Sequence, residues 1–159
     1  MAEKGIWWSL QPFLDDEDAN AYPEGSPNRA KQIEVSEGTD NAYKLAKKYN
    51  IKTAWGTDNL FNAVNAKKQG KKLTKLTRWY SPFEVLKMAT SDNAKLLNLS
   101  GKRSPYQKGA LGVIEEGAYA DMIILNENPL ENIQLIENPH ENFQLIMKDG
   151  VIYKNILNK

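Results

Sequence analysis

The residues that could do chemistry are few, because the sequence has one histidine, His140, and no cysteine. Disulfides, thiolate zinc sites and cysteine nucleophiles are therefore excluded, and so is a histidine-rich metal centre. His140 lacks the G-x-S-x-G nucleophile that it would activate as a base, and Asp15–Asp18 lacks the glycine and terminal glutamate of an EF-hand loop. Asp58 follows a strand-like run, where it is either a capping loop aspartate or a functional carboxylate.

The 159 residues carry a net charge of +1 and are 41% hydrophobic and 26% charged, which is ordinary for one globular domain. This balance predicts no nucleic-acid partner and no membrane partner. A basic cluster without interleaved aromatics is interpreted as a solvated face: Lys67, Lys68, Lys71, Lys72, Lys75 and Arg78. The first residues lack a signal-peptide layout, so we expect the cytoplasm, or the periplasm if the parent protein carries a signal peptide upstream.

The first part of the chain must supply the strands and helices that position these residues. The apolar runs Ile6–Leu10 and Ile51–Thr57 predict two strands. An acidic, turn-rich loop over Asp15–Gly25 and a helix over about Asn28–Tyr49, broken near Gly38, separate them. This order of strand, helix and strand, joined by short connections, predicts a parallel βαβ unit.

Helical patterns continue to about residue 100. We expect residues 62–72, which are polar and rich in lysine, to form a loop. Ser81, Pro82 and Glu84 predict a helix that starts with a capping box. Ser91 predicts a fresh cap for a second helix that runs through Leu97.

Short strands and turns are expected from residue 109 onwards. The segments Gly112–Ile114, Ala120–Leu125 and Phe143–Met147 predict strands, and Asp149–Gly150 predicts a hairpin turn into Val151–Lys154. The decapeptide at 127–136 recurs at 137–146 with two substitutions. Its first copy should form a turn and short helix over Pro129–Ile136, because that copy links two β segments. The second copy should instead provide a strand.

Four segments, in order, resemble the amidohydrolase superfamily: Trp55–Asp58, Ser81–Leu86, Gly112–Ile124 and Ile146–Gly150. Within it the chain is similar to the imidazolonepropionase-like and Xaa-Pro-dipeptidase-like members. The resemblance implies an α/β fold that is the C-terminal portion of a TIM-type barrel hydrolase. Residues 1–100 would be about the last two β/α units, and 109–159 strands of a composite β-sandwich, with Gly101–Lys108 as the linker.

The resemblance also implies a metal-activated water that hydrolyses the C–N bond of an amide, including that of a dipeptide. The intact enzyme would hold a divalent metal such as zinc, and Asp58 would match the aspartate that binds metal and shuttles a proton. Further candidates for the substrate pocket follow the ends of strands: Gln11, Phe13, Asn59 and Phe61. The other metal ligands of the family are absent, so this chain alone is predicted to be inactive and to bind no metal tightly.

Two readings remain open: an enzyme part, as a truncated or split hydrolase, and a non-catalytic interaction module. In either case two strands cannot close a barrel, and their edges remain available for pairing. We therefore expect association through these strands, with either the missing N-terminal half or a second copy of the chain.

Overall fold

The computed structural model describes residues 1–59 and 63–157. They divide into two compact units, Met1–Lys67 and Lys68–Lys159, and each unit is described by itself. The expected division of the chain at Gly101–Lys108, between a barrel part and a β-sandwich part, stays a prediction. No helix within the described residues is long and apolar enough to cross a membrane.

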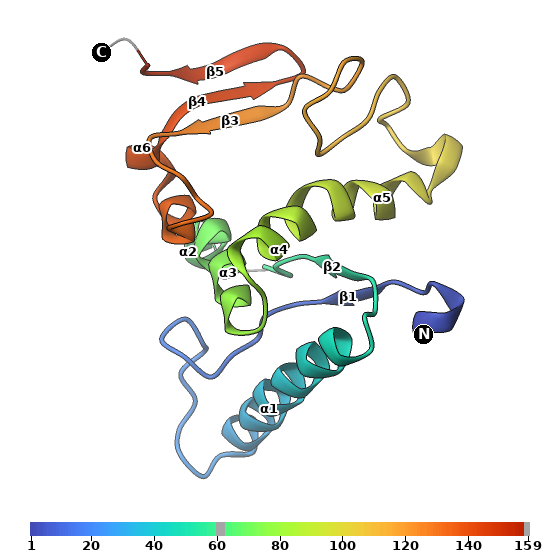
Figure 1. The fold of residues 1–159 in the computed structure, drawn as a ribbon. Helices are drawn as coiled ribbons and strands as arrows, with labels where there is room; N and C mark the ends of the chain where they lie inside the picture. The colour runs from blue at the N-terminus through green and yellow to red at the C-terminus, as the bar shows by residue number, and fades with distance from the viewer. Residues whose placement is uncertain (60–62, 158–159) are drawn as a thin grey trace. The chain divides into compact units, whose positions relative to one another are not determined.

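The unit Met1–Lys67 is built on a βαβ arrangement (Figure 1). Strand β1 (Trp8–Leu10) and strand β2 (Thr53–Trp55) pair in parallel, with helix α1 (Pro27–Lys48) between them in the chain. The predicted parallel pair is thus confirmed, although both strands are shorter than the apolar runs that predicted them. Only three residue pairs form the ladder: Trp8 with Thr53, Ser9 with Ala54 and Leu10 with Trp55.

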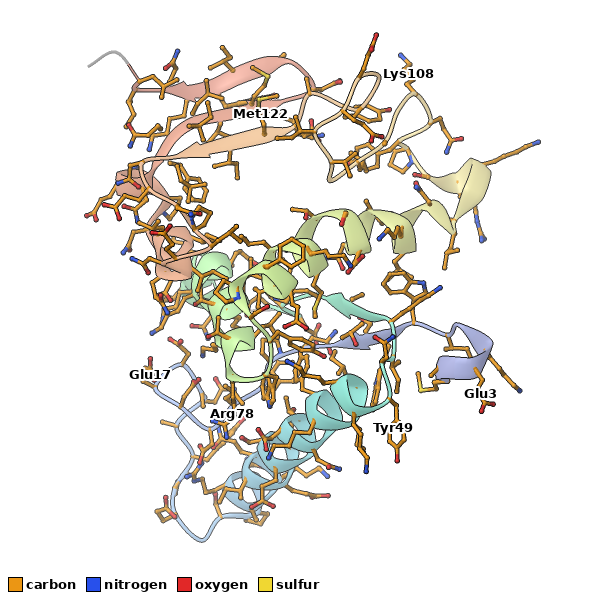
Figure 2. All side chains as sticks on the ribbon, in the orientation of Figure 1. Glu3, Glu17, Tyr49, Arg78, Lys108 and Met122 are labelled. Carbon is orange, nitrogen blue, oxygen red and sulfur yellow. The ribbon has the colours of Figure 1, made fainter. Side chains whose placement is uncertain are left out.

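Helix α1 is continuous, so the predicted break near Gly38 is wrong. The helix begins where the Ser26 hydroxyl accepts a hydrogen bond from the Arg29 N–H and Pro27 occupies the first turn. Gly38 costs about 1 kcal/mol relative to alanine, and the buried side chains of Tyr43 and Ala46 outweigh that cost. Tyr49, which follows the last residue of the helix, is 55% exposed (Figure 2).

Much of the predicted loop over residues 62–72 is helical, which corrects that expectation. Helix α2 covers Ala63–Ala66, and helix α3 covers Gln69–Thr74 and continues into a 3-10 turn, η2 (Lys75–Arg78). Lysine and glutamine have good helix propensity, so a polar composition alone does not indicate a loop. Leu73, Thr74 and Leu76 are buried, and they give α3 and η2 an inner face.

The capping box at Ser81 is confirmed, because the Ser81 hydroxyl accepts from the Glu84 N–H and the Glu84 carboxylate accepts from the Ser81 N–H. It opens helix α4 (Pro82–Lys87). The predicted fresh cap at Ser91 is wrong. The chain instead passes through a π turn, η3 (Met88–Asp92), directly into helix α5 (Asn93–Asn98). A π turn absorbs one extra residue without ending the helix, and a sequence pattern at a period of 3.6 does not reveal it.

A three-stranded antiparallel sheet has the order β3-β4-β5, formed by Met122–Leu125, Phe143–Lys148 and Val151–Asn155 (Figure 1). The predicted hairpin is confirmed: Asp149 (φ 50°) and Gly150 (φ 77°) both have the positive φ that a tight primed turn needs. The side chain of Asp121 stabilises this hairpin through hydrogen bonds. Its carboxylate accepts hydrogen bonds from the Lys148 Nζ (2.7 Å) and the Asp149 N–H (2.6 Å), which hold the Asp121 pKa below its ordinary value.

The predicted strand Gly112–Ile114 is wrong, because this segment is irregular. Gly112 has a φ of 69°, and a Cβ built on it would lie 2.5–2.7 Å from backbone atoms of Thr90 and Ser91 in η3. The segment therefore packs closely on a helical backbone instead of pairing with the sheet.

The duplicated decapeptides differ in structure, as predicted. Both begin with the same Asn-Pro turn, since Asn132 N–H donates to the Asn128 carbonyl and Asn142 N–H donates to the Asn138 carbonyl. The first copy then enters a 3-10 turn, η5 (Ile133–Glu137), whereas the second passes from the one-turn helix α6 (Pro139–Asn142) into β4. In both copies the first and third residues after the turn are buried, and these are Ile133 and Leu135, then Phe143 and Leu145.

Within Lys68–Lys159, helix α3 packs against η5. A Cβ built on Gly70 would lie 2.2 Å from the Ile136 carbonyl oxygen, which is closer than any real Cβ contact. The Thr74 hydroxyl, one turn on, donates to the Glu137 carboxylate at 2.6 Å. This close approach joins the helices to the β segments and requires glycine at position 70.

Two helical glycines offer a matched test of this packing. We expect Gly70→Ala to lower the free energy of unfolding by about 1–3 kcal/mol, because the methyl group overlaps the Ile136 backbone. Gly38→Ala should raise it by about 0.5–1 kcal/mol, since no atom apart from the neighbouring backbone of its own helix lies within 4 Å of its Cβ position. Urea unfolding followed by circular dichroism measures both. Equal stability of the two variants would contradict the close packing of α3 on η5.

Candidate functional site

The carboxyl ends of β1 and β2 lie at one edge of their sheet, because parallel strands run in the same direction. Leu10 pairs with Trp55, so the next residues, Gln11 and Gly56, both leave the ladder at this edge. Asp58 follows two residues after Gly56. Binding and catalytic groups are commonly carried by the loops at the carboxyl ends of parallel strands. This edge is therefore the candidate site.

Asp58 is exposed and has a φ of 49°. Few residues other than glycine adopt this left-handed conformation, although aspartate and asparagine tolerate it better than most. Backbone strain of this kind often lies at functional sites. The chain thus presents a carboxylate to solvent three residues after the end of β2, where it can accept a proton or bind a cation.

The other predicted pocket residues differ in their surroundings. Phe13 is 39% exposed, and its N–H donates to the Gln11 carbonyl at 2.9 Å, so the chain turns sharply after β1. The Gln11 amide lies 3.5 Å from the Ser9 hydroxyl. The Asn59 amide donates to the Asn65 carbonyl at 2.8 Å and so ties the loop after β2 to α2. Phe61 lies outside the described residues, and all four remain predicted pocket residues.

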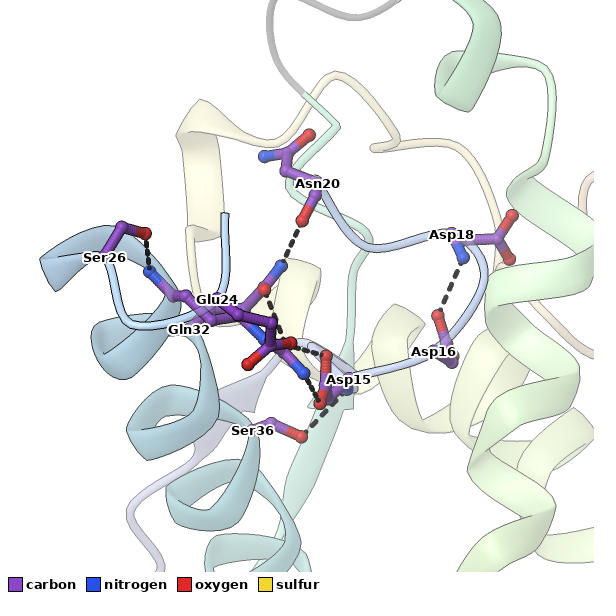
Figure 3. Close-up of polar contacts among 9 residues, drawn as sticks. Asp15, Asp16, Asp18, Asn20, Glu24, Ser26, Gln32 and Ser36 are labelled. Atoms are coloured by element: carbon purple, nitrogen blue, oxygen red, sulfur yellow. Dashed lines mark hydrogen bonds and ion pairs between the residues drawn. The ribbon is translucent and has the colours of Figure 1, made fainter. Parts of the chain in front are cut away.

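A polar network that the sequence analysis missed fixes the loop after β1 onto α1 (Figure 3). The Arg29 guanidinium donates to both carboxylate oxygens of Asp15. The Ser36 hydroxyl accepts from the Asp15 N–H at 2.9 Å, and the Gln32 amide donates to the Asn20 carbonyl at 2.7 Å. The hydrogen bonds from Arg29 hold the pKa of Asp15 below its ordinary value. An arginine three residues after a helix cap is the only sequence signal for this network.

A divalent metal, which the resemblance implies, needs several donor side chains grouped closely together. Among residues 1–59 and 63–157, no three histidine, cysteine, aspartate or glutamate side chains are grouped so that they could hold a metal ion. His140 lies in α6, within the other compact unit, and its backbone carbonyl accepts a hydrogen bond from Lys154. Catalytic zinc takes three protein ligands. The donor set of the described residues therefore does not fit a metal by itself, and Asp58 is one ligand at most.

Substitutions of Asp58 can show whether its left-handed backbone conformation destabilises the fold. We expect Asp58→Gly to be about 1–2 kcal/mol more stable than Asp58→Ala, because only alanine keeps the cost of a left-handed conformation. Asp58→Asn should stay close to the wild type in stability, since asparagine tolerates this region. Thermal and urea unfolding of the three variants give the comparison. Glycine and alanine variants of equal stability would show that the left-handed backbone at position 58 carries no strain.

The sequence model of the Amidohydrolase family matches residues 3–158. The fold is similar to that of an amidohydrolase of known structure, with 28% identity and a TM-score of 0.76 over 99% of this chain and 36% of the other. The ochratoxinase of A. niger gives 26% identity and a TM-score of 0.76 over 98% of this chain and 33% of that enzyme.

A third solved structure is a prolidase complexed with N-methylphosphonate-L-proline. It gives 26% identity and a TM-score of 0.66 over 82% of this chain and 30% of the prolidase. A search of curated proteins finds no significant match. The chain spans about a third of the length of the solved structures it matches. With the family pattern extending over nearly every residue, this mixed α/β chain belongs to the amidohydrolase family.

Proposed function

We propose that this chain is one part of a metal-dependent amidohydrolase that cleaves the C–N bond of amides, with dipeptides as the substrate class. The observation that carries the proposal is that Gln11 and Asp58 follow the ends of β1 and β2, so both lie in loops at the carboxyl edge of one parallel strand pair. The family match over residues 3–158 and the similarity to a prolidase support it.

In this proposal, the βαβ unit of Met1–Lys67 belongs to a TIM-type barrel, and β3, β4 and β5 belong to a small β-sandwich. Asp58 contributes one carboxylate, which binds a divalent metal such as zinc and holds a proton. The remaining ligands come from residues outside this chain, because the described residues offer no group that fits a metal. Gln11, Phe13 and Asn59 line the substrate side of the same edge.

A second candidate function is a non-catalytic interaction module. The donor set favours it, since one carboxylate without further ligands does not hold a catalytic metal. The two candidates differ in one measurable respect: only the enzyme part regains hydrolysis when the missing ligands are supplied.

We predict that the purified chain binds less than about 0.1 zinc per chain and hydrolyses neither amides nor dipeptides, because three protein ligands are the usual minimum for catalytic zinc. Elemental analysis after dialysis against zinc, with a dipeptidase assay, measures both. One tightly held zinc per chain that is lost in Asp58→Ala would contradict this prediction and would assign the chain a metal site of its own.

A chimera with the amidohydrolase relative would supply the metal ligands that the described residues of this chain lack. Residues 1–159 replace the segment that they match in the amidohydrolase of 28% identity. The proposal expects zinc and hydrolysis in the chimera, and a loss of at least about 100-fold in kcat when Asp58 becomes asparagine. Gel filtration and zinc content establish that each chimera is folded. A folded, zinc-loaded chimera that does not hydrolyse amides would favour the interaction module.

We also propose that the chain associates through β1 and β2. Within the described residues their sheet has only these two strands, and Ile6 beside it is 47% exposed. Covering ~500 Å² of apolar surface contributes about 12 kcal/mol by area, against an association cost of ~4–15 kcal/mol. The partner is either the polypeptide that completes the barrel or a second copy.

Light scattering tests this association at tens of micromolar. We expect a mass above the 18.0 kDa of one chain, together with binding of a dye that detects apolar surface. Adding the complementary N-terminal segment of the amidohydrolase relative should lower the self-association if the same strand edges are used. A monodisperse monomer that unfolds cooperatively and binds no dye would contradict the proposal.

A further inference from the structure

One face of the first half of α1 is polar and contacts the loop after β1. Arg29, Gln32 and Ser36 follow one another at spacings of three and four residues, which places them on the same side of the helix. Each of the three forms a hydrogen bond to Asp15 or Asn20 in this loop. We call the segment of residues 11–20, from Gln11 to Asn20, the rim segment, because it starts at the carboxyl edge of β1.

The contacts between this face and the rim segment form one connected network. The Arg29 guanidinium donates two hydrogen bonds to the Asp15 carboxylate. Its nitrogens also donate to the Glu24 carboxylate at 3.4 Å and to the Gln32 amide oxygen at 2.8 Å. Gln32 in turn donates to the Asn20 carbonyl. The rim segment is thus held at Asp15 and Asn20, and Arg29 takes part in both attachments, directly at Asp15 and through Gln32 at Asn20.

The exposed fractions of the residues on α1 distinguish this polar face from the rest of the helix. The Arg29 side chain is only 21% exposed, whereas the apolar residues Ile33 and Val35 are 37% and 41% exposed. A surface helix normally turns apolar residues inward. In the first half of α1, the side chains that bond to the loop are instead the ones that are partly covered.

We propose that Arg29 is a positioning residue that holds the rim segment, and with it Gln11 and Phe13, in the conformation that binds substrate at the Asp58 edge. The inference rests on the proposed function and adds to it how the substrate contacts are fixed. Arg29 touches no reacting atom and acts through Asp15 and Gln32. The rim segment offers the substrate an amide group and a half-exposed aromatic ring.

Arginine is suited to this task because its planar fork binds both oxygens of one carboxylate and still has N–H groups for other acceptors. A lysine at position 29 would keep the positive charge but could not bind both carboxylate oxygens with two parallel N–H groups. Lys31 provides a matched control, since it forms an exposed ion pair with Glu34 on the same helix and neither residue bonds to the rim segment.

The first arm of the test is hydrogen–deuterium exchange of the full chain. Arg29→Ala should speed exchange in residues 11–20 about fivefold to tenfold, with Arg29→Lys intermediate and Lys31→Ala unchanged. The remainder of α1 should keep its protection, which separates loss of the attachment from loss of the helix. Unchanged exchange in residues 11–20 of Arg29→Ala would overturn the positioning role.

The second arm uses the chimera with zinc and a dipeptide substrate. Arg29→Ala should raise KM about tenfold and change kcat less than about twofold, because it disturbs binding and not the reacting groups. Arg29→Lys should restore part of KM, and Lys31→Ala should match the parent chimera. An active parent with an unchanged KM in Arg29→Ala overturns this inference alone. A folded, zinc-loaded parent without activity overturns the proposed function and this inference with it.

Discussion

The parallel pairing of β1 with β2 determines at which edge of the sheet Gln11 and Asp58 lie. Because the two strands run in the same direction, the loops that leave them emerge on one side, and Gln11 and Asp58 share an edge although 47 positions of sequence separate them (58 − 11). An antiparallel pair would place the two loops at opposite ends. The helix between the strands permits the parallel arrangement, and its polar face then holds the first of the two loops.

Local signals in the sequence were sufficient where the structure depends on neighbouring residues. The capping box at Ser81 and the turn at Asp149–Gly150 were predicted correctly, since both are satisfied within a few residues. The parallel strand pair was also predicted, because strand, helix and strand follow with short joints. The position of Asp58 after a strand came from the same pattern.

Other features were missed because they depend on contact between residues far apart in the chain. Gly112 lies against the backbone of η3, so a strand-like segment becomes an irregular one. Helix α3 gains a partner in η5, so a polar stretch becomes a helix. The Arg29–Asp15 pair spans 14 positions and follows no periodicity that a single sequence displays. The two decapeptides make the same point, because nearly one sequence gives a 3-10 turn in one place and a strand in another.

The left-handed backbone at Asp58 also limits how this position can change over evolutionary time. Most substitutions there would impose a conformational cost on the loop, and glycine and asparagine are among the replacements with the lowest cost. Asparagine is nearly isosteric with aspartate and removes only the charge. One conservative exchange, from aspartate to asparagine, could therefore remove the carboxylate and leave the loop and the fold unchanged. Under the proposed function, that single exchange would separate catalysis from binding.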